Sequence, residues 1–111
     1  MLVISNYKKG DPVTVKLSTG EELVARFDAD VGGELKVVKP TVLTLNPSNG
    51  QAMLIPWLMS IDAHDSSPVV INKNLVVAIS RPIKALADNY MQNTSGITPA
   101  SSLPLGESLK L

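Results

Sequence analysis

Residues Leu17–Leu35 read LSTGEELVARFDADVGGEL, and this stretch decides the fold class. Its segment Ser18–Glu21 is typical of a tight turn, because Gly20 accepts the positive φ that such turns require. Every second residue is apolar on both sides of the turn: Val13, Val15 and Leu17 before it, and Leu23, Ala25 and Phe27 after it. A period of two is typical of half-buried strands, so the stretch predicts a β-hairpin.

The segments that follow indicate further strands. Leu35–Leu45 is rich in β-branched residues, although Pro40 requires a bulge or an exposed edge there. Asn46–Gly50 is a strong turn signal, after which Gln51–Ile61 reads as a bent returning strand. Two short apolar strands come last, Val69–Ile71 and Leu75–Ile79, joined by the polar turn Asn72–Asn74. We therefore predict a mainly β fold, a small, strongly bent, five-stranded barrel over residues 1–80 with an inserted segment at about 51–67.

A helix is expected after the barrel, over residues 81–96, with Ser80 as its N-cap and Pro82 in its first turn. Its apolar residues recur at helical spacing and form one stripe: Ile83, Leu86, Ala87, Tyr90 and Met91. Residues 97–111 are rich in Ser, Pro and Gly, which predicts a flexible tail.

Composition limits the class of protein. The 111 residues suit one domain, and 44% apolar with 18% charged residues is typical of a globular chain. The formal net charge is zero, which argues against strong non-specific binding to nucleic acid. There is no cysteine, so a disulfide framework and a thiolate metal site are excluded. The chain begins without a secretion signal pattern and contains no long apolar run, so we expect a cytoplasmic protein.

These residues resemble the Sm/LSm family, which includes the bacterial riboregulator Hfq. The segment Val13–Gly20 is similar to the family's opening strand and its Leu-x-x-Gly turn, and Ala25, Phe27 and Asp30 follow at the family's spacing. The second family motif is matched in outline by Ile71–Leu75. The segment ALADNYMQNTSGI of the predicted helix also looks like small Sm-like proteins of tailed phages of marine cyanobacteria. This resemblance implies a protein that functions inside a bacterial host cell.

The resemblance implies a ring-shaped homo-oligomer, a pentamer to a heptamer, that acts in RNA metabolism or regulation. The residues at the family's RNA-binding positions are Asp30, Gly33, Glu34, Asn72, Lys73 and Asn74. Their chemistry differs from the family's pocket, because no aromatic or His side chain lies in the loop and Glu34 occupies the position of the base-reading Asn. An ionised carboxylate donates no hydrogen bond and repels phosphate. A structural loop, or a site for another ligand, is therefore the alternative interpretation.

Assembly is indicated more directly by the last two strands. Neither contains a charge, although exposed edge strands in proteins are usually protected by charged residues, Pro or bulges. We expect them to pair between subunits through Val69, Val70, Ile71, Leu75, Val76, Val77, Ala78 and Ile79. The alternative function is a ring without RNA, a structural or assembly module, that contacts a protein partner through Trp57, the 51–67 segment and the helix.

Other candidate sites are weaker. Asp62, His64 and Asp65 carry metal-ligand chemistry, but such a loop is usually solvated turn chemistry, and we predict neither a metal site nor a cofactor. No catalytic motif is present, so we predict a protein that is not an enzyme. Basic residues alternate with apolar ones and indicate either a solvated strand face or a weak phosphate track: Lys8, Lys9, Lys16, Arg26, Lys36 and Lys39.

Overall fold

A computed structural model describes residues 6–62 and 65–94 of the chain. It contains six antiparallel strands in one sheet and a C-terminal helix, which confirms the mainly β fold class. The strands are β1 (Pro12–Leu17), β2 (Glu22–Val31), β3 (Glu34–Leu45), β4 (Ala52–Pro56), β5 (Val69–Asn72) and β6 (Val76–Ser80). A single-turn 3₁₀ helix, η1 (Lys73–Leu75), joins β5 to β6, and the α-helix α1 spans Lys84–Thr94.

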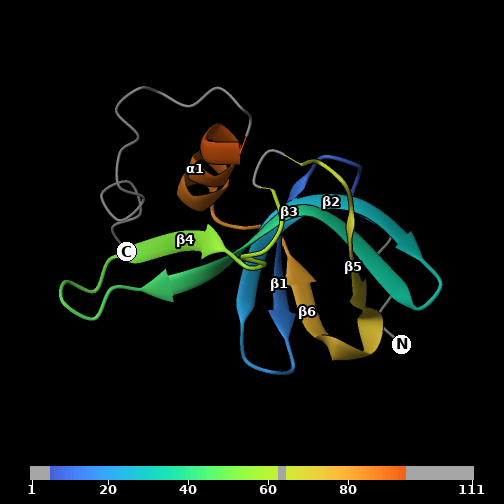
Figure 1. Cartoon of the computed structure of the whole chain (residues 1–111), viewed down its shortest axis with the longest axis horizontal. Coiled ribbons are helices and arrows are strands. Elements are labelled where there is room, and N and C mark those ends of the chain that lie inside the picture. Colours follow the sequence, from blue (N-terminus) through green and yellow to red (C-terminus); the bar gives the residue numbers. More distant parts are fainter. Residues whose placement is uncertain (1–5, 63–64, 95–111) are drawn as a thin grey trace.

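The sheet is organised around β2 and β3, which bend across the other strands (Figure 1). Its strand order is β4-β3-β2-β1-β6, and β5 pairs with β3 as well. The first part of β3, Glu34–Val37, pairs with β5, whereas Thr41–Leu45 pairs with β4. Between the two parts the register of β2 and β3 shifts, and Lys39 there has a φ of 50°. The irregularity that Pro40 requires is therefore the point at which β3 changes partner.

Two apolar cores lie on opposite faces of the sheet. The first contains the alternating residues of the predicted hairpin, together with residues of β3, β5 and β6: Val13, Val15, Leu17, Leu23, Ala25, Phe27, Leu35, Val37, Ile71 and Val76. The second lies under α1 and contains Val24, Ala52, Leu54, Leu86 and Tyr90. Val24 is fully buried although its neighbours Leu23 and Ala25 face the first core. Strand β2 is therefore covered on both of its faces.

The structure differs from the prediction in two local respects. The returning strand predicted over Gln51–Ile61 is shorter, β4 (Ala52–Pro56), and with it the sheet has six strands, whereas the sequence predicts a five-stranded barrel. The helix begins at Lys84, and the first helical hydrogen bond runs from the amide of Ala87 to the carbonyl of Ile83 at 2.9 Å. Residues 95–111, which include the predicted end of the helix and the tail, lie outside the described part of the chain. No helix within the described part is long and apolar enough to cross a membrane.

Candidate functional site

The two loops that the resemblance assigns to RNA lie side by side in the structure. Strand β2 continues to Val31 and β3 begins at Glu34, so Gly32 and Gly33 alone form the turn between them. Glu34 is paired in register with Asn72 at the end of β5. The amide of Lys73 donates to the carbonyl of Gly33 at 2.9 Å, which fixes η1 against the turn.

Lys73 is the centre of this site. It is the single buried charged or polar residue of the described chain, with 8% of its surface exposed. Its ammonium forms an ion pair with the carboxylate of Asp30 and donates to the carbonyl of Gly32 at 3.0 Å. The Asp30 side chain is 19% exposed, so both charges are largely withdrawn from water. A buried charge is tolerated when it is paired and hydrogen-bonded, as Lys73 is.

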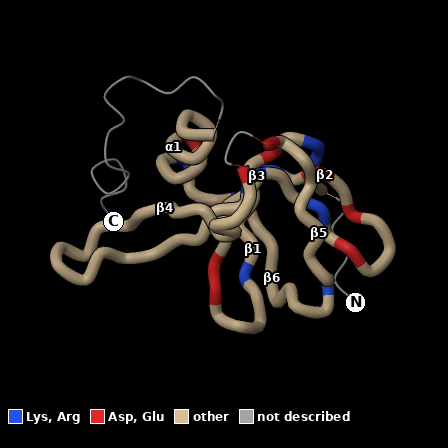
Figure 2. The backbone as a smooth tube through the Cα atoms, in the orientation of Figure 1, with Lys and Arg blue, Asp and Glu red and all other residues tan. Residues whose placement is uncertain are grey.

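All six predicted contact residues lie together. The contacts of Lys73 with Asp30 and with the β2–β3 turn are structural, and we call them the lock. The cation that would meet phosphate already binds the Asp30 carboxylate and the carbonyl of Gly32, and the backbone amide of Lys73 donates to the carbonyl of Gly33. The exposed carboxylate of this region is Glu34, and Figure 2 shows acidic positions in both strands that flank the turn. Asn72 uses its side-chain oxygen to accept the amide of Asn74 at 2.9 Å. The exposed groups that a ligand could reach are the side-chain amides of Asn72 and Asn74.

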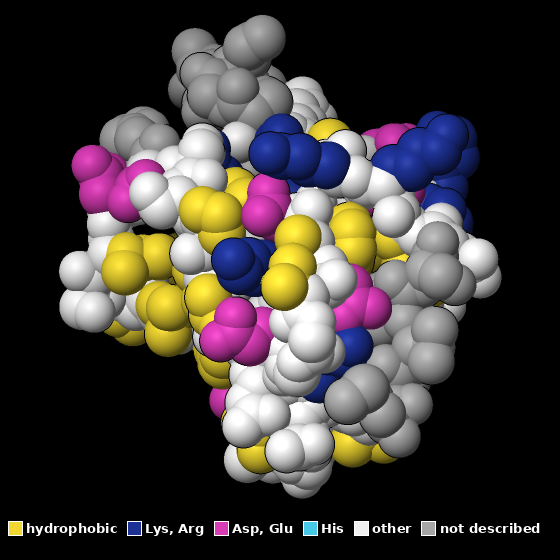
Figure 3. Space-filling model, turned by 90° about the vertical axis from the view of Figure 1, so that its right-hand side faces the viewer, with side chains coloured by type: hydrophobic (Ala, Val, Ile, Leu, Met, Phe, Trp, Pro, Cys, Tyr) yellow, Lys and Arg dark blue, Asp and Glu magenta, His cyan; other side chains and the backbone are white. Residues whose placement is uncertain are grey.

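The predicted assembly strands divide into core and surface residues. Ile71 and Val76 belong to the first core, whereas Val70, Leu75 and Val77 are 52%, 44% and 61% exposed. Within the described residues β5 pairs with β3 alone, and β6 pairs with β1 alone. Each strand therefore has one edge without a strand partner there. On the side of the molecule that carries β5 and the β2–β3 turn, hydrophobic side chains are interspersed with Lys, Arg, Asp and Glu (Figure 3).

Trp57 is held in place rather than free for a partner. Its ring packs against the first core, and its backbone amide donates to the carbonyl of Pro40 at 3.1 Å. The indole N–H donates to Glu21 Oε2 at 3.2 Å. The Thr19 hydroxyl donates to the other oxygen of Glu21, and these two hydrogen bonds hold the pKa of Glu21 below its usual value. The side chain thus connects the β1–β2 turn to the segment after β4.

The loop from Asp62 to Ser67 contains the turn hydrogen bonds that the sequence predicts. The amide of Asp65 donates to the carbonyl of Asp62 at 3.0 Å, and Ser67 donates to the Asp65 carboxylate through both its amide and its hydroxyl. These bonds lower the pKa of Asp65. His64 lies outside the described residues, and within them no group of three or more His, Asp or Glu side chains could hold a metal ion.

Sequence reasoning missed one cluster of polar residues at the end of α1. The Tyr90 hydroxyl lies within hydrogen-bond distance of the carbonyls of Lys39 (2.8 Å) and Val38 (3.0 Å), and burial raises the pKa of Tyr90 to about 12. Arg26 and Lys39 both contact Thr94 beside it. The available signal was Pro40 inside a strand, because the bulge it indicates redirects the preceding side chain.

Comparison with protein-family models and with curated proteins gives no match for this chain.

Proposed function

We propose that the protein is a self-assembling β-barrel module whose copies join head to tail, the β5 edge of one copy to the β6 edge of the next. The observation that carries this proposal is the pair of edges without a strand partner in the described chain, both on strands without charged residues. Such edges offer unpaired backbone N–H and C=O groups to another chain. The exposed Val70 and Val77 add apolar surface beside these groups.

The two edges differ from each other, which decides the symmetry of the assembly. A contact between β5 and β6 is heterologous, and it must either close into a ring or continue as a filament. The lock between Lys73 and the β2–β3 turn fixes η1, the connection between the two edge strands. A fixed angle between the edges favours a closed ring, and five to seven copies is the size that the family resemblance implies.

RNA binding is the second candidate function, and the convergence of the two loops favours it. The contacts would come from the exposed Asn72 and Asn74 rather than from Lys73, which is engaged with Asp30. Few phosphate contacts imply a shallow dependence of affinity on salt. Fluorescence anisotropy with a short uridine-rich RNA at two salt concentrations, with Asn74→Ala as the variant, tests this candidate. If RNA does not bind, the alternative of a protein-binding assembly is favoured.

The proposal of assembly is tested by size-exclusion chromatography with light scattering. We expect an oligomer for the unmodified chain, and a monomer for Val70→Lys and for Val77→Lys, because a charge at a strand edge opposes pairing. Leu45→Lys is the matched control, since Leu45 is equally exposed (61%) but lies at the far end of β3. Circular dichroism verifies that each variant is folded. An unmodified chain that stays monomeric at about 100 µM, a concentration at which a pairing worth about 6–8 kcal/mol would be populated, would contradict the proposal.

A further inference from the structure

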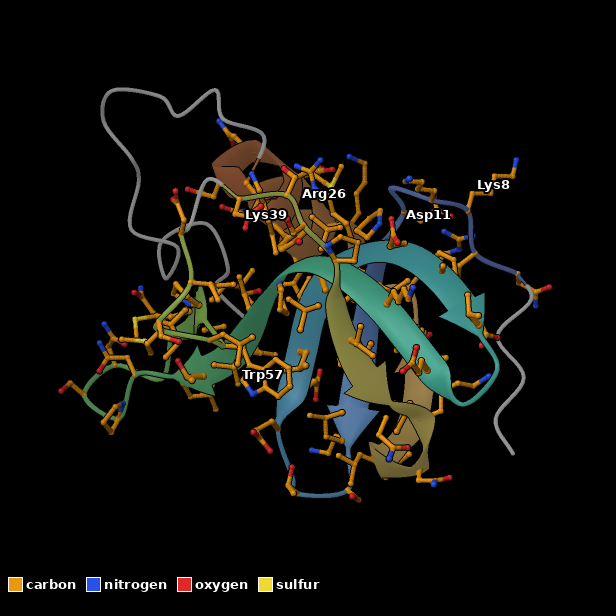
Figure 4. The ribbon with its side chains drawn as sticks, turned by 45° about the vertical axis from the view of Figure 1, so that its right-hand side comes forward. Lys8, Asp11, Arg26, Lys39 and Trp57 are labelled. Atoms are coloured by element: carbon orange, nitrogen blue, oxygen red, sulfur yellow. The ribbon has the colours of Figure 1, made fainter. Side chains whose placement is uncertain are left out.

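Two cations meet on one residue at the C-terminal end of α1. Arg26 donates from Nη2 to the hydroxyl of Thr94 at 3.0 Å, and Lys39 donates from Nζ to the carbonyl oxygen of Thr94 at 2.9 Å. Figure 4 shows Arg26, on β2, and Lys39, on β3, close to each other beside the helix. Both residues are half-buried, so each positive charge is partly withdrawn from water but the cluster is not enclosed.

These two charges have no acidic partner in the described chain. Its ion pairs are Lys9–Asp28, Lys73–Asp30, Arg81–Asp11 and Lys84–Asp88, and none includes Arg26 or Lys39. The Nε–H group of Arg26 is buried and has no hydrogen-bond partner among residues 6–62 and 65–94. The carbonyl end of a helix supplies the equivalent of only about half a negative charge. Counted over the described residues, the cluster therefore keeps a net positive charge of more than one unit, which is costly where water is partly excluded.

The local backbone directs Lys39 into this cluster. A non-glycine residue with a positive φ is strained, and Lys39 adopts a φ of 50° at the bulge where β3 changes partner. The Tyr90 hydroxyl, 2.8 Å from the carbonyl oxygen of Lys39, supports that conformation from the helix side. In a regular strand successive side chains point to alternate faces, whereas a bulge changes the direction of the side chain, here that of Lys39. Three separate elements, β2, β3 and α1, thus converge on one positive site.

We propose that Arg26 and Lys39 form a binding site for the phosphate group of a ligand. A phosphate oxyanion supplies the missing negative charge, and its oxygens match the planar guanidinium and the ammonium, which are the two side chains best suited to phosphate. The site lies at the end of α1, on a different part of the sheet from the edges of β5 and β6. It would be occupied whether or not the chain assembles, so this inference is independent of the proposed function.

The chain offers a direct probe of the site, because Arg26 and Arg81 are its only arginines. A titration of the ¹⁵N-labelled protein with inorganic phosphate, followed through the two arginine Nε–H resonances, separates the two residues. We expect a saturable shift of the Arg26 resonance and little change for Arg81. Lys39→Gln should weaken the binding by about tenfold or more, since a charge-assisted hydrogen bond is lost.

Lys36→Gln is the matched control, because Lys36 is a half-buried cation on the same strand and lies outside the cluster. It should leave the phosphate titration unchanged. Near-ultraviolet circular dichroism shows whether Tyr90 stays packed in the Lys39→Gln variant. An Arg26 resonance that does not move, or one that responds equally in the Lys39→Gln and Lys36→Gln variants, would overturn the inference.

Two sources of phosphate are distinguished by a second titration. A free phosphate compound should saturate the site as inorganic phosphate does. A phosphodiester, probed with a uridine dinucleotide at the same ionic strength, should bind more tightly than inorganic phosphate if the natural ligand is a nucleic-acid backbone. Stronger binding of inorganic phosphate would assign the site to small phosphate compounds. Binding of neither probe would refute the site itself.

Discussion

The buried ion pair between Lys73 and Asp30 should contribute measurably to stability, and its contribution can be isolated. Lys73→Met retains an apolar stem of similar length but removes the ammonium, which leaves the Asp30 carboxylate and the carbonyl of Gly32 without this donor. Loss of one partner from a fully buried pair costs about 3–5 kcal/mol. Because the Asp30 side chain is 19% exposed, water restores part of its solvation, and we expect about 2–3 kcal/mol.

The assay is equilibrium unfolding in urea, followed through Trp57, the single tryptophan of the chain. All variants are compared at one protein concentration, because assembly makes apparent stability depend on concentration. Asp30→Asn alone should cost about 2–4 kcal/mol, because it leaves the ammonium of Lys73, whose side chain is 6% exposed, without a counter-charge, although the neutral amide still accepts a hydrogen bond. The double variant should be destabilised by at least about 1 kcal/mol less than the sum of the two single variants. If the two effects add within about 0.5 kcal/mol, the proposed lock between the β2–β3 turn and η1 is wrong.

Further predictions concern the helix and the tryptophan. Tyr90→Phe should cost about 1–2 kcal/mol, measured by urea unfolding, because the backbone carbonyls of β3 lose a donor. The pKa of Tyr90 is raised to about 12, so its contribution to stability is present below about pH 10 and is lost as the pH rises toward 12. A phenolate absorbance titration detects the ionisation that causes this loss. The pKa of Glu21 is lowered, so its contribution to stability is present above the usual carboxylate pKa and is lost as the pH falls through the lowered value. Trp57 fluorescence should change over that acidic range, and the change should be absent in Glu21→Gln. Leu86→Ala should cost about 2–4 kcal/mol by the same unfolding assay, because Leu86 is buried in the second core.

The strands with a regular pattern could be predicted from the sequence. In β1 and in the first part of β2, period-two alternation identified the buried face, and Val13, Val15 and Leu23 are fully buried. The same rule assigned Val24 to the outer face and gave no reason for its burial. Its burial depends on α1, which packs on that face from about 60 residues later in the sequence. Alternation describes one strand and its two faces, and it contains no information about which distant element covers a face.

The candidate site shows a similar division. The positions of the two loops followed from the family resemblance, and the structure places those residues in contact. The partner of Lys73 could not be read from the sequence, because Asp30 is 43 residues away and was itself assigned to ligand contact. The two loops are adjacent only when β5 pairs with the first part of β3. Non-local pairing of this kind decides whether a charge is available for a ligand or is used within the fold.

The change of partner along β3 separates the sites of the two proposals. Before Lys39, β3 pairs with β5 and belongs to the part of the sheet that ends in the edge proposed for assembly. After Pro40, β3 pairs with β4 and belongs to the part that α1 covers through the second core. The bulge between the two parts directs Lys39 to the end of α1, and the Tyr90 hydroxyl supports its backbone there. Phosphate bound at Arg26 and Lys39 would therefore stabilise the junction between these two parts of β3. We expect assembly through β5 and β6 to be unchanged by Lys39→Gln, because the lock at Lys73 holds that edge independently.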